Sequence, residues 1–148
     1  MLVEIQNGDY TINTDKKKLK PVVIHTFLKN SYWSPGITFD YVKKAIKNSE
    51  CFGLYFKGEQ VGFARVITDY TSLGYLADVF ILEKHRGKGL AKWMLESIFK
   101  HPDLQNIRKW MLATKDAHTL YERYGFQSVE NPAKYMIKPN AEFVFGKG

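Results

Sequence analysis

The chain has almost no cysteine and no long apolar run, and each absence excludes a class of protein. Cys51 is the only cysteine among 148 residues, so an intrachain disulfide, a C-x-x-C redox pair and a cysteine-rich zinc site are excluded. No stretch approaches the roughly 18 consecutive apolar residues of a membrane-spanning helix. The first residues lack a basic segment followed by a long apolar one, so no secretory signal is predicted. We therefore expect a cytoplasmic protein.

The composition is that of an ordinary globular domain with an excess of positive charge. Hydrophobic residues make up 45% of the chain and charged residues 25%, and we expect residues 1–148 to form one soluble domain. Lys and Arg total 22 against 15 Asp and Glu, which gives a net charge of +7. Such an excess indicates an anionic partner: phosphate, nucleic acid or an acidic membrane surface.

The hydrophobic spacing predicts a mixed α/β protein. We expect helices at 21–28, 38–47, 89–101 and 116–124, and strands at 10–14, 51–56, 60–68, 75–82, 109–113, 126–129 and 135–137. The two strands at 51–68 form a hairpin, and the strands at 75–82 and 109–113 form a parallel pair joined by a crossover helix. The last two strands are expected to close the sheet.

A glycine turn at 83–92 joins an apolar strand directly to an amphipathic helix. The free N–H groups and positive dipole of a helix N-terminus, together with Gly87 and Gly89, would make an anion cradle. The turn does not match a Walker loop, because Gly89 stands where Ser or Thr is needed, and Lys92 breaks a dinucleotide fingerprint. A plain tight turn with surface lysines is the alternative.

Two motifs carry a resemblance to a known family. Arg86, Gly89 and Ala91 form R-x-x-G-x-A, which resembles the acyl-CoA signature of the GNAT superfamily of N-acyltransferases. Downstream, residues 116–126 resemble the alanine, Leu-Tyr and Gly-Phe helix of that superfamily. The resemblance covers nearly the whole chain. It is strongest to a bacterial branch with the features Ser31-Tyr32-Trp33, Gly36-Ile37, Asp78-Val79-Phe80 and Trp93.

The resemblance implies a fold and a cofactor site. The fold would be a central mixed sheet flanked by helices, with the fourth and fifth strands, here 75–82 and 109–113, splayed apart. Acyl-CoA would lie in the gap, with its pantetheine on the backbone of Val79, Phe80 and Ile81. Its pyrophosphate would lie on the turn formed by Arg86, Gly87, Lys88, Gly89, Leu90 and Ala91. Thr114 stands where many members have a cofactor-binding asparagine, and this departure puts that contact in question.

The resemblance also implies a catalytic residue. Tyr121 matches the tyrosine whose hydroxyl faces the CoA sulfur in relatives, although its spacing alone fits a core tyrosine. Asp78 is the only acid in its apolar strand and is our candidate general base, with a structural aspartate as the alternative. Glu83, Glu122 and ordered water are further candidates for the base.

Tyr32 and Trp33 are candidates for the acceptor pocket, or else a pair of packing aromatics. The four histidines lack metal-ligand spacing, so we expect no metal. The leading hypothesis is an N-acetyltransferase that transfers acetyl from acetyl-CoA to a primary amine of a small molecule or peptide in a ternary complex. A GNAT-fold acyl-CoA sensor and a basic nucleic-acid-binding module are the alternatives. On the leading hypothesis we expect no nucleic acid or membrane partner, and a homodimer is left open.

Overall fold

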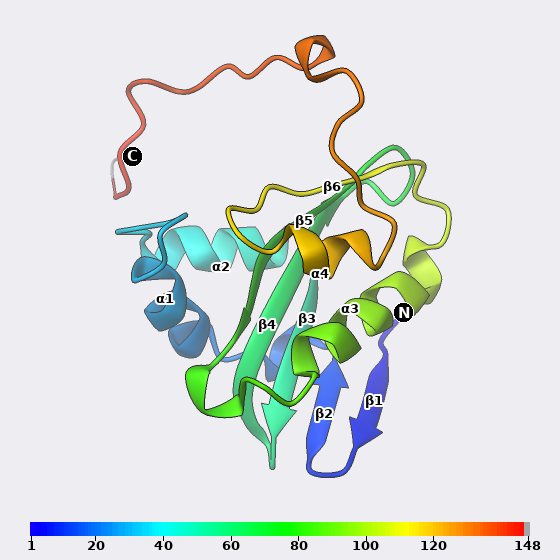
Figure 1. The fold of residues 1–148 in the computed structure, drawn as a ribbon. Helices are drawn as coiled ribbons and strands as arrows, with labels where there is room; N and C mark the ends of the chain where they lie inside the picture. Colours follow the sequence, from blue (N-terminus) through cyan, green and yellow to red (C-terminus); the bar gives the residue numbers. More distant parts are fainter. Residues whose placement is uncertain (147–148) are drawn as a thin grey trace.

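The protein is built on one six-stranded sheet, seen in a computed structural model that describes residues 1–146 (Figure 1). The strands lie in chain order across the sheet, antiparallel throughout except for the parallel pair β5 and β6. They are β1 Glu4–Asn7, β2 Tyr10–Asn13, β3 Glu50–Phe56, β4 Glu59–Thr68, β5 Gly74–Ile81 and β6 Trp110–Met111. No helix in the described part of the chain is long and apolar enough to cross a membrane.

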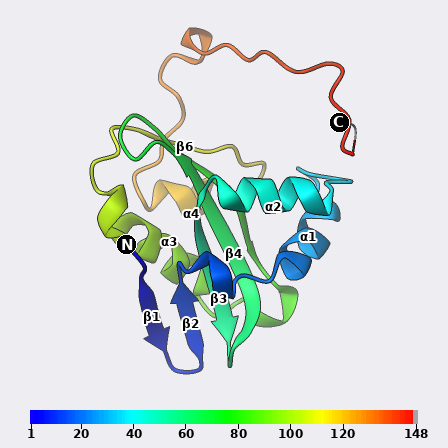
Figure 2. The same cartoon turned by 180° about the vertical axis from the view of Figure 1, so that it is seen from behind.

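Helices cover both faces of the sheet. They are α1 Pro21–Lys29, α2 Phe39–Lys47, α3 Leu90–Lys100 and α4 His118–Glu122. Helices α1 and α2 pack on one face with a core that includes Phe63 and Phe80, and α3 packs on the other with Phe52 and Leu54 (Figures 1 and 2). Thr38 caps α2 as the sequence predicts, because its side chain accepts a hydrogen bond from the amide of Tyr41.

The hairpin and the parallel pair predicted from the sequence are confirmed. A two-residue turn joins β3 to β4, with Lys57 and Gly58 both at positive φ, which is the geometry of a tight hairpin turn. Strand β1 was not predicted. Its signal is nevertheless present, since Gly8-Asp9 is a glycine-first hairpin turn that joins β1 to β2, with Asn7 paired to Tyr10.

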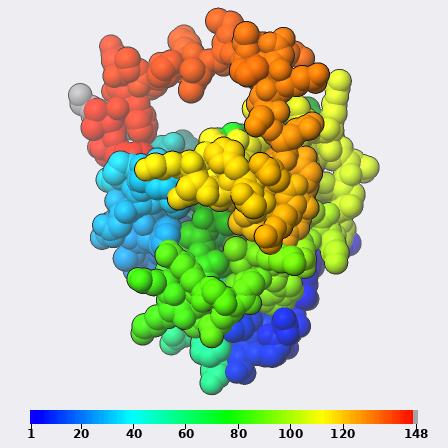
Figure 3. All heavy atoms as spheres, in the orientation of Figure 1, coloured from blue at the N-terminus to red at the C-terminus, as the bar shows by residue number. Residues whose placement is uncertain are grey.

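The prediction for the C-terminal part is wrong. Residues 126–129 and 135–137 form no strand in the described residues, and the segment arches away from the body (Figure 3). Met136 is 97% exposed, so the three-residue apolar run buries little surface. Pro132 and Pro139 flank the run and lack the N–H that a sheet ladder needs, which explains why the run is left out of the sheet.

The splayed strands implied by the resemblance are present. Strands β5 and β6 pair only at Gly74 with Trp110 and at Tyr75 with Met111. A Cβ on Gly74 would lie 2.9 Å from the Trp110 ring, so the absence of a side chain there permits this close contact. Beyond Tyr75 the edge of β5 that faces β6 is unpaired, and the predicted strand 109–113 is shortened to two residues. A gap therefore opens between the strands, at the carboxyl end of β5.

Candidate active site

Strand β5 contains a bulge at Asp78. The pairing of β4 with β5 shifts between Phe63 and Arg65, so Asp78 and Val79 together lie opposite one residue of β4. Asp78 has φ of 54°, in the left-handed region that side chains other than glycine rarely adopt. A bulge bends its strand and redirects a side chain. This bulge lies in the part of β5 that is no longer hydrogen-bonded to β6.

Both carboxylate oxygens of Asp78 accept hydrogen bonds. Arg65 Nε donates to Oδ2 over 2.6 Å, and Trp33 Nε1 donates to Oδ1 over 2.9 Å. Arg65 Nη1 also donates to Ser49 Oγ over 3.1 Å. Asp78 therefore joins the loop after α1 to the two central strands, and the adjacent guanidinium balances its charge.

A cavity of about 590 Å³ lies in front of this group, between the loop after α1 and the segment after β6. Tyr32 and Trp33 line it and are 59% and 41% exposed, with their rings in edge-to-face contact at 5.1 Å. Tyr75 and Tyr121 also line the cavity. Tyr32 and Trp33 therefore line a cavity, and their contact with the acceptor stays a prediction.

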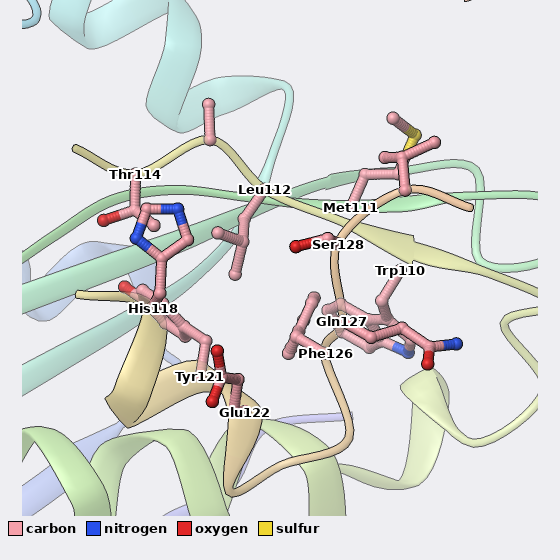
Figure 4. Close-up of a pocket in the computed structure, with 12 residues that line it drawn as sticks. Trp110, Met111, Leu112, Thr114, His118, Tyr121, Glu122, Phe126, Gln127 and Ser128 are labelled. Atoms are coloured by element: carbon pink, nitrogen blue, oxygen red, sulfur yellow. The ribbon is translucent and has the colours of Figure 1, made fainter. Parts of the chain in front are cut away.

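Tyr121 lies on α4 between two cavities. It lines the 590 Å³ cavity and also a second one of about 370 Å³ between β6 and residues 126–129 (Figure 4). Burial, followed by the nearby hydroxyl of Tyr32, raises the pKa of Tyr121 above that of an ordinary tyrosine. The phenol is therefore protonated at neutral pH and can donate a hydrogen bond.

Thr114 fixes the start of the segment that carries Tyr121. Its Oγ1 accepts a hydrogen bond from the amide of Ala117 over 3.1 Å, and α4 begins at the next residue. The hydroxyl proton of Thr114 is not used in that bond, and Thr114 lines both cavities. The helix is shorter than predicted, at His118–Glu122, because the chain turns at Gly125 with φ of 90°.

The glycine turn has the backbone geometry of a cradle. Gly87 and Gly89 have φ of 77° and 74°, and α3 begins immediately afterwards at Leu90. Arg86 Nε donates to the carbonyl of Ile81 over 2.9 Å, which fixes the side chain against the end of β5. Lys88 is exposed. Positive charge and free helix amides therefore lie together at this turn.

His85 supports the turn from behind. Its Nδ1 lies 2.7 Å from the hydroxyl of Tyr10, and its ring packs against Phe56. The histidine therefore joins the glycine turn to β2 and β3.

The predicted site residues divide between the cavity and the turn. One group lines the large cavity: Tyr32, Trp33, Asp78, Val79, Thr114 and Tyr121. The residues of the turn, 86–91, do not line it and lie at the start of α3. Phe80 and Ile81 are buried in the sheet, where Phe80 stacks on Phe27 with 4.0 Å between ring centroids.

Sequence reasoning missed several residues of the cavity, and three of them bear on its chemistry. They are Arg65, Tyr75 and Lys115. Arg65 had a signal, because it is the only charge inside the apolar strand β4. Lys115 Nζ lies 5.4 Å from the centre of the Tyr32 ring, a contact across 83 residues of sequence that no local pattern announces. In residues 1–146 no group of three or more His, Cys, Asp or Glu could hold a metal ion.

Comparison with known proteins settles which family has this arrangement. A family model described as an acetyltransferase (GNAT) domain matches residues 47–128, which include β5, the glycine turn and Tyr121. The chain belongs to the GNAT acetyltransferase family. A GNAT-family crystal structure from Xanthomonas campestris pv. campestris, provisionally named an acetyltransferase, is 43% identical with a TM-score of 0.86. It covers 88% of this chain and 92% of that chain.

Other acetyltransferases resemble the chain over shorter or more divergent stretches. A Gibberella zeae protein, provisionally named an acetyltransferase, is 34% identical over 77% of this chain and 76% of its own length. The spermine/spermidine N(1)-acetyltransferase of Bacillus subtilis is 34% identical over 51% of this chain and 57% of its own length. A Clostridium acetobutylicum structure with acetyl-CoA shares the fold at 18% identity, with a TM-score of 0.63, and covers 88% and 94% of the two chains.

Proposed function

We propose that the protein transfers an acetyl group from acetyl-CoA to a primary amine of a small molecule or peptide, by direct attack in a ternary complex, and that residues 1–148 act as one domain. One observation carries the proposal: the protonated phenol of Tyr121 lines a cavity that opens onto the unpaired edge of β5. That cavity also has room for an amine beside Tyr32 and Trp33.

The residues present fit acetyl-CoA at two places. Beyond Tyr75 the edge of β5 that faces β6 has no strand partner, so backbone groups of Val79, Phe80 and Ile81 are candidates to pair with an extended pantetheine. The amides of 87–91, with Arg86 and Lys88, provide donors and charge for a pyrophosphate. The free hydroxyl proton of Thr114 is a candidate for the contact that asparagine makes in many members.

The residues then have two tasks, at the sulfur and at the amine. When bound, acetyl-CoA supplies a thioester whose carbonyl carbon accepts the amine nitrogen and whose sulfur leaves. Tyr121 donates a hydrogen bond to the sulfur as negative charge develops there. Complete proton transfer from an ordinary phenol of pKa about 10 to a thiolate whose acid has pKa about 8.5 is already uphill by about 2 kcal/mol, and the raised pKa of Tyr121 makes it more so. Stabilisation by the hydrogen bond is therefore the main role of Tyr121.

The amine must lose a proton before it attacks. A lysine-like amine is neutral in about one molecule in 2,500 at pH 7, which corresponds to about 4.6 kcal/mol. From the sequence, Asp78 was the candidate base that accepts this proton. In the structure both carboxylate oxygens of Asp78 accept hydrogen bonds, and the Arg65 guanidinium pairs with its charge. These contacts favour a positioning role for Asp78, with the proton leaving through water in the cavity.

Release of free thiol from acetyl-CoA tests the proposal. The protein is assayed with amines, amino acids, polyamines, aminoglycosides and peptides, and thiol is measured against a blank without acceptor. Thiol above the blank with at least one amine, with the acetylated amine identified by mass spectrometry, is the expected result. Binding of CoA without turnover on any acceptor would favour a sensor instead. Salt-sensitive binding of DNA without any binding of CoA would favour the nucleic-acid module.

A further inference from the structure

Four aromatic side chains line the 590 Å³ cavity: Tyr32, Trp33, Tyr75 and Tyr121. Trp33 is held in place on two sides, by its hydrogen bond to Asp78 and by its ring contact with Phe27 at 6.1 Å between centroids. Exposed aromatic rings that are fixed in this way offer flat apolar surface to a ligand.

The same cavity has almost no free negative charge. Its charged lining residues are two basic and two acidic: Arg65, Lys115, Asp78 and Asp116. Asp78 is already paired with Arg65 at 2.6 Å. The described lining therefore carries no net charge, and its one carboxylate outside a salt bridge, that of Asp116, is exposed and adjacent in the chain to Lys115.

One of the exposed aromatic rings of the cavity already has a cation beside it. Lys115 Nζ lies 5.4 Å from the centre of the Tyr32 ring, so the protein's own ammonium group lies at the face where a ligand ammonium would otherwise bind. A second ammonium brought to this face would meet like charge from Lys115.

Monoamines and polyamines differ in the charge that they carry when one amine is ready to attack. An amine must be neutral when it attacks, so a monoamine becomes an uncharged ligand in a neutral site. A polyamine keeps its other ammonium groups charged after one of them loses its proton. Those charges lose hydration in the cavity, where the exposed Asp116 is the one carboxylate of the described lining outside a salt bridge.

Resting on the proposed acetyl transfer, we propose that the acceptor is a monoamine with a flat, apolar or aromatic body that lies against Tyr32 and Trp33, and that polyamines are poor acceptors. The matching part of the B. subtilis spermine/spermidine acetyltransferase covers only 51% of this chain. Of the two acidic side chains in the described lining of this cavity, Asp78 is paired with Arg65, so only the exposed Asp116 could compensate the charges of a polyamine.

The test compares three primary amines: phenylethylamine, cyclohexylethylamine and spermidine. The value of kcat/KM is measured from thiol release at saturating acetyl-CoA and pH 8. Phenylethylamine is expected to exceed cyclohexylethylamine by about fivefold, because only the former has a flat ring. It should exceed spermidine by about tenfold or more. Spermidine equal to or better than phenylethylamine would overturn the inference while leaving acetyl transfer intact.

Two variants locate the effect. Trp33→Leu should lower kcat/KM about fivefold for phenylethylamine and little for cyclohexylethylamine, and Trp33→Phe should restore most of the loss. An equal loss for both amines would indicate a merely structural role and contradict the inference. Lys115→Glu changes the charge at position 115 from +1 to −1 and should raise the ratio of kcat/KM for spermidine to that for phenylethylamine about tenfold. An unchanged ratio would contradict the charge argument.

A measurement without turnover separates this inference from the proposed function. Calorimetry with phenylethylamine and spermidine is performed on the protein saturated with CoA. Tighter binding of phenylethylamine supports the inference even where no amine releases thiol, an outcome that would end the proposed function alone. Absence of phenylethylamine binding, or tighter binding of spermidine, would overturn the inference.

Discussion

Arg65 Nε donates a hydrogen bond to Asp78 Oδ2 over 2.6 Å, between neighbouring strands at the bulge of β5. The side chains are only 16% and 7% exposed. Because Asp78 also accepts from Trp33, the same ion pair fixes the bulge, the aromatic wall and the charge of the cavity. A change in either partner should therefore affect stability and acceptor binding together.

Removing both partners of this pair should cost less stability than the sum of the two single losses. Arg65→Met and Asp78→Asn should each lower the free energy of unfolding by about 3 kcal/mol, because each leaves the other side chain poorly compensated in a mostly buried site. The double variant should lose clearly less than the sum. Urea unfolding of the four proteins measures the coupling. Additive losses would show that the two side chains do not depend on each other.

The pH dependence of Asp78→Asn separates its two roles. If Asp78 positions Trp33, the variant should raise KM for the amine and keep the wild-type loss of kcat/KM at acidic pH, since the amine itself is the group that titrates. The full pH profile is compared with that of Trp33→Leu. Disappearance of the acidic limb together with a large fall in kcat would instead make Asp78 the general base.

The backbone of the glycine turn should matter for CoA beyond its effect on stability. Gly89→Ala forces a side chain into φ of 74°, where there is space for the Cβ but the backbone conformation is unfavourable. Gly8→Ala is the matched control, because Gly8 has φ of 61° and open space in the β1–β2 turn. Both should lose about 1–2 kcal/mol of stability. Only Gly89→Ala should weaken CoA binding in calorimetry, and equal CoA affinity in the two variants would count against the cradle.

The charges of the turn should bind CoA in a salt-dependent way. Arg86→Ala with Lys88→Ala should weaken CoA about tenfold at low salt, and the difference from wild type should shrink as salt is added. The control pair, Lys17→Ala with Lys18→Ala, removes the same charge from a short surface helix after β2. That pair should leave CoA affinity near the wild-type value. A similar loss in both pairs would point to net charge rather than to this turn.

Local patterns predicted the elements that local forces determine. The hairpin at 50–68 follows from two mostly apolar runs on either side of the turn Lys57-Gly58. Helix α3 follows from apolar residues at helical spacing after Gly89. The C-terminal strands failed because a three-residue run such as 135–137 needs tertiary partners that sequence does not reveal. Short strands are stabilised by packing rather than by propensity.

The parts of the candidate site that lie in a continuous sequence motif could be predicted. The parts that depend on how neighbouring strands pair could not. The glycine turn and Tyr121 could be named from residues adjacent in the chain. The pairing of Arg65 with Asp78 could not, because it depends on a bulge that shifts β5 by one residue against β4. The contact of Lys115 with Tyr32 depends on the splay of β5 from β6.

Tyr121→Phe removes the hydroxyl that we propose stabilises the leaving thiolate. Since burial raises the pKa of Tyr121 above its ordinary value, the hydroxyl is protonated and can donate at neutral pH. The contribution of this group to folding stability is complete below the pKa of an unfolded tyrosine and is lost as the pH rises through the raised pKa of the folded protein. The control is Tyr124→Phe, which lies one turn further along and removes a hydroxyl that donates to the Lys92 carbonyl. That control should keep wild-type turnover.

The most direct measurement is kcat of Tyr121→Phe with acetyl-CoA and a saturating amine, beside the Kd for acetyl-CoA from calorimetry. A fall in kcat of about 100-fold with an unchanged Kd is the predicted result, since the lost bond forms only as charge develops on the sulfur. Full turnover in Tyr121→Phe would remove Tyr121 from the mechanism and contradict the account.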